Sequence, residues 1–162
     1  MITVICLLRG ADPALPAQIA ARLIPGDRVI LVDDSGDPQA LTRARALTWP
    51  EHIAVTAIVT GTPAPGDGGI ATNLALDRVI TSHALVLEGA ARLTGPLPRP
   101  VDRTLSLGPD PDLAQALFPV TALRRAEGIA RSELGFLWAL MQAHPVARVA
   151  PWAATPPAPA PA

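Results

Sequence analysis

The chain contains no lysine and no tyrosine, and a single cysteine, Cys6, among its 162 residues. The lack of lysine excludes every mechanism that needs an amine side chain, including a Walker-type phosphate loop and a phospho-accepting receiver site. A lone cysteine inside an apolar run excludes an internal disulfide and indicates a small buried side chain. The formal net charge of -1 provides no basic surface, so we expect no nucleic-acid partner.

Long apolar runs are also lacking. The amino-terminal stretch, residues 1–8, has no basic region before it and is too short to span a bilayer, so we expect no transmembrane segment and a cytoplasmic location. A length of 162 residues suits one domain with a sizeable core. We expect that domain to cover residues 1–150, followed by a disordered, flexible Pro/Ala-rich tail at 151–162.

The chain does contain a repeated alternation of short apolar strands with amphipathic helices. Residues 29–32 are four consecutive apolar residues, which is typical of a strand buried on both faces. Similar strands are predicted at 3–8, 53–59 and 84–87, and helices between them at 13–23, 38–47 and 70–79. This order predicts an α/β domain with a mostly parallel sheet and helices on both faces, which makes three layers.

The other segments are less regular. Residues 61–69 are rich in glycine and proline and predict a surface loop. In the helix that follows, we expect Ala71, Leu74, Ala75 and Val79 to face the sheet. Further predicted elements are a strand at 104–107, helices at 121–126 and 132–144, and an edge strand at 146–150.

Two carboxylates, Asp33 and Asp34, directly follow the apolar run at 29–32. In open α/β sheets, ligands bind in the crevice outside the carboxyl ends of the strands, so a polar ligand would meet these side chains. The alternative is a solvated turn in which aspartate serves as turn former and helix cap.

Three segments resemble the family 2 glycosyltransferases, whose nucleotide-binding domain has the GT-A fold. Val32-Asp33-Asp34-Ser35-Gly36-Asp37 is similar to the acidic strand end of that family, Gly69 to Leu76 is similar to its Gly-rich helix entry, and Leu8-Arg9-Gly10 stands at its first-strand motif. The resemblance implies a single GT-A-like (Rossmann-like) domain that binds a UDP- or GDP-linked nucleotide sugar and transfers the glycosyl group to a hydroxyl. The residues that it implies at the nucleotide are Leu8, Arg9, Asp33, Asp34, Ser35, Asn73 and Arg92.

The sequence departs from the family pattern at its catalytic carboxylates. The metal-binding Asp-x-Asp of the family stands here as Glu88-Gly89-Ala90, so Glu88 is the implied ligand of Mn²⁺ or Mg²⁺, which one carboxylate would hold weakly. Arg92 could replace the metal as a cationic clamp on the pyrophosphate. Glu133 is the implied general base, and the acidic residue expected beside it is Leu134. With two carboxylates missing, the resemblance implies impaired catalysis.

Each implied site residue also has a structural interpretation. Asn73 could be a polar helix residue that faces water, and Glu88 could form a surface salt bridge with Arg92. Glu133 could be a first-turn acid that complements a helix dipole. The alternative function is therefore a non-catalytic interaction module, a pseudo-glycosyltransferase that contacts a protein partner in a larger assembly. The three histidines, His52, His83 and His144, lack ligand spacing and are expected to be structural or exposed.

Overall fold

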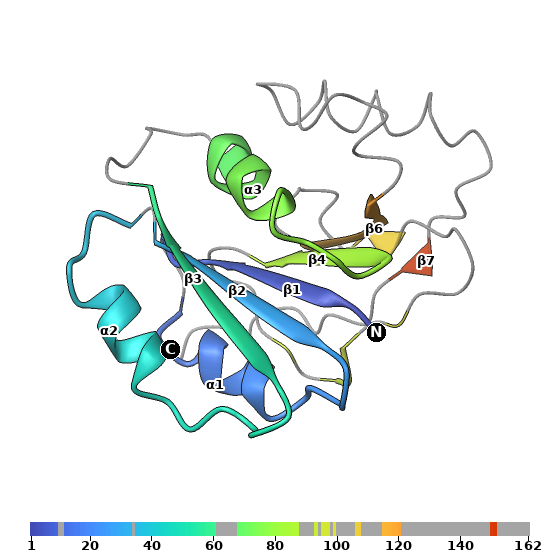
Figure 1. Ribbon diagram of the computed structural model, residues 1–162, viewed down its shortest axis with the longest axis horizontal. Coiled ribbons are helices and arrows are strands. Elements are labelled where there is room, and N and C mark those ends of the chain that lie inside the picture. Colours follow the sequence, from blue (N-terminus) through green and yellow to red (C-terminus); the bar gives the residue numbers. More distant parts are fainter. Residues whose placement is uncertain are drawn as a thin grey trace, which may run out of the picture.

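The computed structural model describes residues 1–9, 12–33, 35–60, 68–87, 93, 95–97, 99, 106–107, 115–120 and 150–151 (Figure 1). In chain order the elements are β1 (Thr3–Leu7), α1 (Leu15–Ala20), β2 (Arg28–Asp33), α2 (Ala40–Arg45), β3 (Ala54–Val59), α3 (Gly68–Leu76), β4 (His83–Leu87), β5 (Ser106–Leu107), β6 (Gln115–Pro119) and β7 (Ala150–Pro151). The predicted alternation of strands and helices through residue 87 is confirmed.

The strands form one sheet in the order β3-β2-β1-β4-β6-β5-β7. The first four strands are parallel, with β1 between β2 and β4, whereas β6 runs antiparallel to both β4 and β5. The prediction of a mostly parallel α/β sheet is therefore confirmed. β5 lies within the strand expected at 104–107, and β7 ends one residue beyond the expected domain limit at 150.

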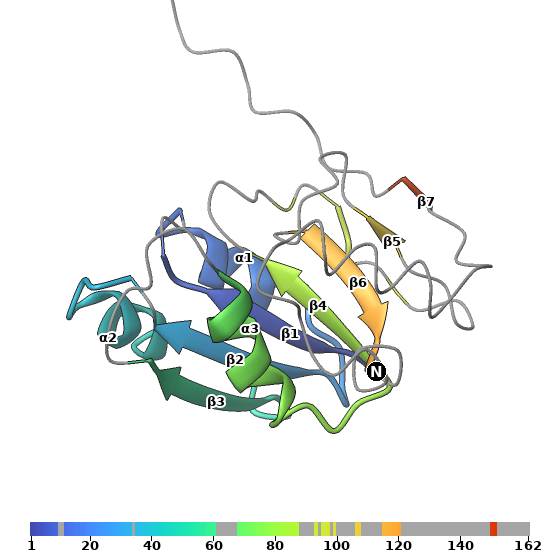
Figure 2. The ribbon, with the colours of Figure 1, turned by 90° about the horizontal axis from the view of Figure 1, so that it is seen from above.

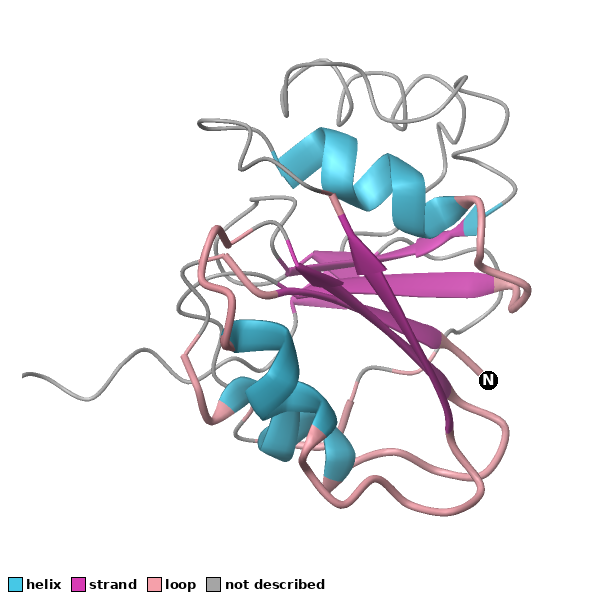
Figure 3. Ribbon diagram, turned by 60° about the vertical axis from the view of Figure 1, so that its left-hand side comes forward, coloured by secondary structure: helices cyan, strands magenta, loops and turns pink. Residues whose placement is uncertain are grey.

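Helices cover both faces of the sheet, as Figures 2 and 3 show. On one face, Leu15 and Ile19 of α1 and Leu41 of α2 join a buried cluster with Cys6 and Leu31 of the sheet. On the other face, the α3 residues Ala71 and Ala75 pack with a second cluster from β1, β2 and β4. The three predicted layers are present. Burial raises the pKa of the Cys6 thiol to about 12, as expected for a cysteine in the core.

Two Asp-Pro pairs begin the first two helices. The Asp12 carboxylate accepts a hydrogen bond from the Ala14 N–H at 2.9 Å, and the Asp37 carboxylate accepts one from the Gln39 N–H at 2.9 Å. The backbone carbonyl of each aspartate then accepts from the third residue along, where the regular helix begins. The predicted helix starts at 13 and 38 were early by two residues, because a tight turn precedes each helix.

The face that α3 turns to the sheet differs from the predicted one. Ala71, Thr72, Ala75 and Leu76 are buried, whereas Leu74 is 43% exposed. The expectation that Leu74 faces the sheet was wrong, because the buried positions follow i, i+1, i+4, i+5 and Leu74 lies outside that arc. The contact face is therefore made mostly of small residues.

A segment that follows β4 returns across the α1 side of the sheet. Leu93 and Leu97 are buried in the same cluster as α1. Arg22 donates hydrogen bonds to the carbonyls of Leu93 at 2.6 Å and Gly95 at 2.7 Å, and the Gln18 side chain accepts from the Leu93 N–H at 2.8 Å. The described residues of this stretch, Leu93, residues 95–97 and Arg99, are called the return segment below.

The return segment ends in an ion pair with a buried carboxylate. The Arg99 guanidinium donates to both carboxylate oxygens of Asp27, at 2.8 and 2.7 Å. The same carboxylate accepts from the backbone N–H of Ile2 and of Ile24, each at 3.1 Å. The Asp27 side chain is fully buried, so its charge is compensated by four donor contacts rather than by water.

Candidate functional site

The carboxyl ends of β1 and β2 lie side by side. Leu7 pairs with Val32, and the Leu8 N–H continues the ladder by donating to the Val32 carbonyl at 2.9 Å. Because the strands are parallel, the residues that follow them meet at the same edge of the sheet. Four of the predicted nucleotide-side residues therefore lie at this edge: Leu8, Arg9, Asp33 and Ser35.

The loop after β2 is held together by Ser35. Its hydroxyl donates to Asp33 Oδ1 at 2.7 Å, and its backbone N–H lies 3.3 Å from the same oxygen. The Ser35 hydroxyl also accepts from the Asp37 N–H at 3.0 Å. Gly36 has a φ of 72°, which favours glycine over residues with a side chain. Asp33 is thus a turn former, as in the structural interpretation, and its carboxylate is fixed in orientation at the sheet edge.

The backbone of Asp33 connects this loop to the next strand. Its carbonyl accepts from the Thr60 N–H at 3.1 Å and from the Thr60 hydroxyl at 3.2 Å. The end of β3 is thereby joined to the start of the acidic loop. Because Thr60 holds the Asp33 carbonyl through two hydrogen bonds, the backbone of Asp33 has little freedom to move.

Asp37 belongs to α2 rather than to the strand edge. Its carboxylate accepts from the Gln39 N–H and forms a 2.5 Å ion pair with Arg43. These two donors lower the pKa of Asp37, with the backbone N–H of Gln39 as the larger cause and Arg43 as the next. Because its carboxylate is held by the Gln39 N–H and by Arg43, we assign Asp37 a role in the turn that precedes α2.

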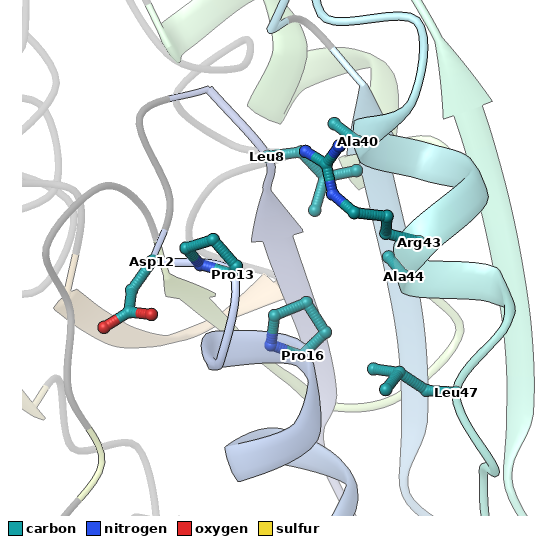
Figure 4. Close-up of a pocket in the computed structure, with 8 residues that line it drawn as sticks. All are labelled: Leu8, Asp12, Pro13, Pro16, Ala40, Arg43, Ala44 and Leu47. Carbon is teal, nitrogen blue, oxygen red and sulfur yellow. The ribbon is translucent and has the colours of Figure 1, made fainter.

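A small groove lies next to the edge, between the start of α1 and α2 (Figure 4). It has a volume of about 140 Å³. Its lining is mainly apolar, with one acidic and one basic residue: Leu8, Asp12, Pro13, Pro16, Ala40, Arg43, Ala44 and Leu47. Among the predicted site residues, Leu8 is the one that lines this groove. Asp12 and Arg43 were not predicted as site residues, and no sequence motif distinguishes them.

Asn73 lies in α3, in the layer on the opposite side of the sheet from α1 and α2, and is half-buried. Its predicted contact with a nucleotide stays a prediction. Four further predicted site residues lie outside the described residues: Asp34, Glu88, Arg92 and Glu133. Their predicted roles are carried forward below as proposals.

Within the described ranges, no group of three or more His, Cys, Asp or Glu side chains could hold a metal ion. The one predicted ligand, Glu88, is outside those ranges. Likewise, none of the helices among the described residues is long and apolar enough to cross a membrane.

Two solved structures share this arrangement of strands and helices. The mannosyltransferase PcManGT from Pyrobaculum calidifontis, in complex with GDP-Man and Mn²⁺, superposes with a TM-score of 0.60 at 19% identity over 81% of this chain. TarS from S. aureus superposes with a TM-score of 0.55 at 13% identity over 86% of this chain. The chain has a GT-A-like glycosyltransferase fold.

This GT-A-like chain is shorter than either neighbour, since it spans 48% of PcManGT and 33% of TarS. No family model and no curated protein matches its sequence. The two superpositions confirm the predicted GT-A-like fold.

Proposed function

We propose that this chain binds a nucleotide sugar, UDP- or GDP-linked, at the carboxyl edge of β1 and β2. The observation that carries the proposal is the backbone hydrogen bond from Leu8 to Val32, which brings the end of β1 beside the end of β2, where Ser35 orients the Asp33 carboxylate. In open α/β sheets this edge is the usual place for a ligand. PcManGT, which has the same fold, was solved with GDP-Man and Mn²⁺.

In this proposal, the two aspartates after β2 contact the nucleoside. The carboxylate of Asp33 keeps one oxygen on Ser35 and offers the other to a ribose hydroxyl or a base N–H, and Asp34 extends the same acidic edge. Arg9 supplies positive charge beside the phosphates. Asn73 contributes from α3, and Arg92 clamps the pyrophosphate.

Glu88 is the residue that would hold Mn²⁺ or Mg²⁺, which would supply charge neutralisation at the departing pyrophosphate. The donor set fits a metal poorly, because Ala90 stands where a second carboxylate is expected and hard cations prefer several oxygen ligands. We therefore propose weak metal binding.

Glycosyl transfer to a hydroxyl acceptor would need a base to take the acceptor proton, and Glu133 is the residue proposed for it. The absence of carboxylates at Ala90 and Leu134 favours slow turnover. The same two positions favour the second candidate function, a pseudo-glycosyltransferase that keeps the nucleotide crevice or the scaffold and contacts a protein partner in a larger assembly.

Thermal-shift and calorimetric titrations with UDP, GDP and their sugars, with and without Mn²⁺, test the proposal. We expect one nucleotide to stabilise the chain, since a ligand that binds the folded state alone raises its stability. Asp33→Asn should weaken that binding by roughly tenfold, because it removes one charge-assisted hydrogen bond while its amide oxygen still accepts from Ser35. Asp37→Asn is the matched control in the same loop, because the Asp37 carboxylate already contacts the Gln39 N–H and Arg43 and has no proposed role at the nucleotide.

The outcomes separate the candidate functions. Stabilisation that requires Mn²⁺ supports a metal-using transferase, and stabilisation without metal supports a nucleotide-binding site assisted by arginine. A chain that responds to no nucleotide would favour the interaction module. Equal losses in Asp33→Asn and Asp37→Asn would mean that the loop, and not the Asp33 carboxylate, matters.

A further inference from the structure

β3 forms one end of the sheet, and among the described strands it pairs with β2 alone (Figure 2). Its sequence, Ala54-Val55-Thr56-Ala57-Ile58-Val59, contains no charged residue and no proline. Sheet edges are commonly protected from pairing by charged side chains, proline or bulges. None of these devices is present within the six residues of β3, and Val59 is 64% exposed.

The hydrogen-bonding groups that β3 leaves open can be assigned from its pairing with β2. The Thr60 N–H donates to the Asp33 carbonyl, so the backbone groups of Thr60 and of every second residue before it point to β2. Successive residues of a strand direct these groups to opposite sides. The N–H and C=O groups of Val55, Ala57 and Val59 therefore point away from the sheet.

The side chains of β3 follow the same alternation across the two faces. Val55 and Ala57 pack against the cluster on the α1 and α2 side, whereas Ile58 packs against the cluster on the α3 side. By the same alternation, the Val59 side chain lies on the face of the sheet that carries Val55 and Ala57. The residues with open backbone groups are thus the ones whose side chains face the α1 and α2 side.

We propose that β3 pairs antiparallel with β3 of a second copy of this chain, centred on Ala57 opposite Ala57. In that register the three outward-facing residues form hydrogen-bonded pairs, with Val55 of one copy opposite Val59 of the other. Each facing pair lies on the same side of the joined sheet, as an antiparallel ladder requires. The exposed Val59 side chain gains an apolar neighbour.

The strand itself points to a second copy as the partner. A two-fold axis through Ala57 satisfies both the open backbone groups and the side-chain faces with no other chain, and it creates a closed, isologous contact. No like charges meet, because β3 has none. The proposal does not depend on nucleotide binding, since no residue of the predicted nucleotide site takes part in the proposed contact between the two copies.

Sedimentation velocity and light scattering of the full chain over a concentration series test the contact. We expect a monomer–dimer equilibrium that Val59→Lys shifts toward monomer by at least about tenfold in Kd, since a charge at the edge opposes strand pairing. Ile80→Lys is the matched control, because Ile80 is 71% exposed and lies outside β3. A chain that is monomeric up to about 0.1 mM overturns the proposal.

Cysteine crosslinking tests the register. Ala57→Cys should form a disulfide-linked dimer under mild oxidation, because facing Cα atoms in a hydrogen-bonded pair are about 5.5 Å apart. Thr56→Cys should crosslink more slowly, since the proposed register offsets the two Thr56 residues. The native Cys6 is buried and does not compete. A dimer that resists Val59→Lys, or that crosslinks faster through Thr56→Cys, contradicts the proposed pairing.

Discussion

At the scale of single residues, Ser35 decides how the acidic loop presents Asp33. Its hydroxyl donates to the Asp33 carboxylate and accepts from the Asp37 N–H, so one side chain joins both ends of the loop. The sequence pattern predicts that Asp33 follows a strand and stands at the sheet edge. It could not predict this internal hydrogen bonding, which depends on how the loop closes at Gly36.

Replacing Ser35 with alanine removes both hydrogen bonds. We expect Ser35→Ala to lower nucleotide affinity several-fold while costing about 1 kcal/mol in the free energy of unfolding, the usual value for such hydrogen bonds. Calorimetric titration and urea unfolding measure the two effects. Ser35→Thr, which keeps the hydroxyl, should restore most of the affinity. If Ser35→Ala binds as tightly as the wild type, the loop does not orient Asp33 for a ligand.

The ion pair of Asp27 and Arg99 predicts which of two alanine substitutions lowers the free energy of unfolding more. Asp27→Ala should destabilise the chain by about 3 kcal/mol, because it leaves the guanidinium and two backbone N–H groups without their acceptor. Arg99→Ala should cost less, since Arg99 is 32% exposed and its loss leaves the Asp27 carboxylate with two backbone donors. Urea unfolding measures both. A larger loss for Arg99→Ala than for Asp27→Ala would contradict this assignment.

At the scale of elements, the predictions succeeded where local sequence decides the structure. Asp-Pro pairs marked the starts of α1 and α2 to within two residues, since the turn is built by the aspartate itself. Leu74 was misplaced because packing against the sheet, rather than residue type, sets which arc of α3 is buried. β6 was missed because its longer pairing is with β4, which lies far from it in sequence, with the return segment and β5 between them.

The start of α2 should depend on pH through Asp37. The pKa of this carboxylate is lowered in the folded chain by the Gln39 N–H and by Arg43, so ionised Asp37 favours folding. Its contribution is present above the unfolded pKa of about 3.9 and is lost as the pH falls through the lower folded value. Asp37→Asn should therefore be less stable than the wild type near neutral pH, and the difference should vanish in acid.

Urea midpoints of the wild type and Asp37→Asn, measured by circular dichroism from about pH 7 to about pH 2, give that difference directly. Asp12→Asn serves as the comparison, because the Asp12 carboxylate accepts the same kind of backbone hydrogen bond, from the Ala14 N–H, in the turn before α1. A stability difference that grows as the pH falls would contradict the role given to Asp37.

At the scale of the whole molecule, four parallel strands bring the ends of β1 and β2 to one edge, and that edge could be predicted from the sequence. Each of the first strands is followed by a helix, which forces parallel pairing, and parallel strands carry their following residues to a common side. The order of the strands could not be predicted, because β1 lies between β2 and β4 through contacts that no local pattern encodes. The GT-A-like fold was predicted from the resemblance of the acidic loop to the family 2 glycosyltransferases, and the two solved structures have the same fold.

The central claim is that the edge formed by β1 and β2 binds a nucleotide. A titration of ¹⁵N-labelled chain with GDP and UDP, with Mg²⁺ as the diamagnetic cation, tests it most directly through amide chemical shifts. The account predicts that one nucleotide shifts the amides of Leu8, Arg9, Asp33 and Ser35 more than those of β3 or of the return segment. If the chemical shifts of these four amides do not change with either nucleotide, even at concentrations that saturate any shifts seen elsewhere, the result would contradict it.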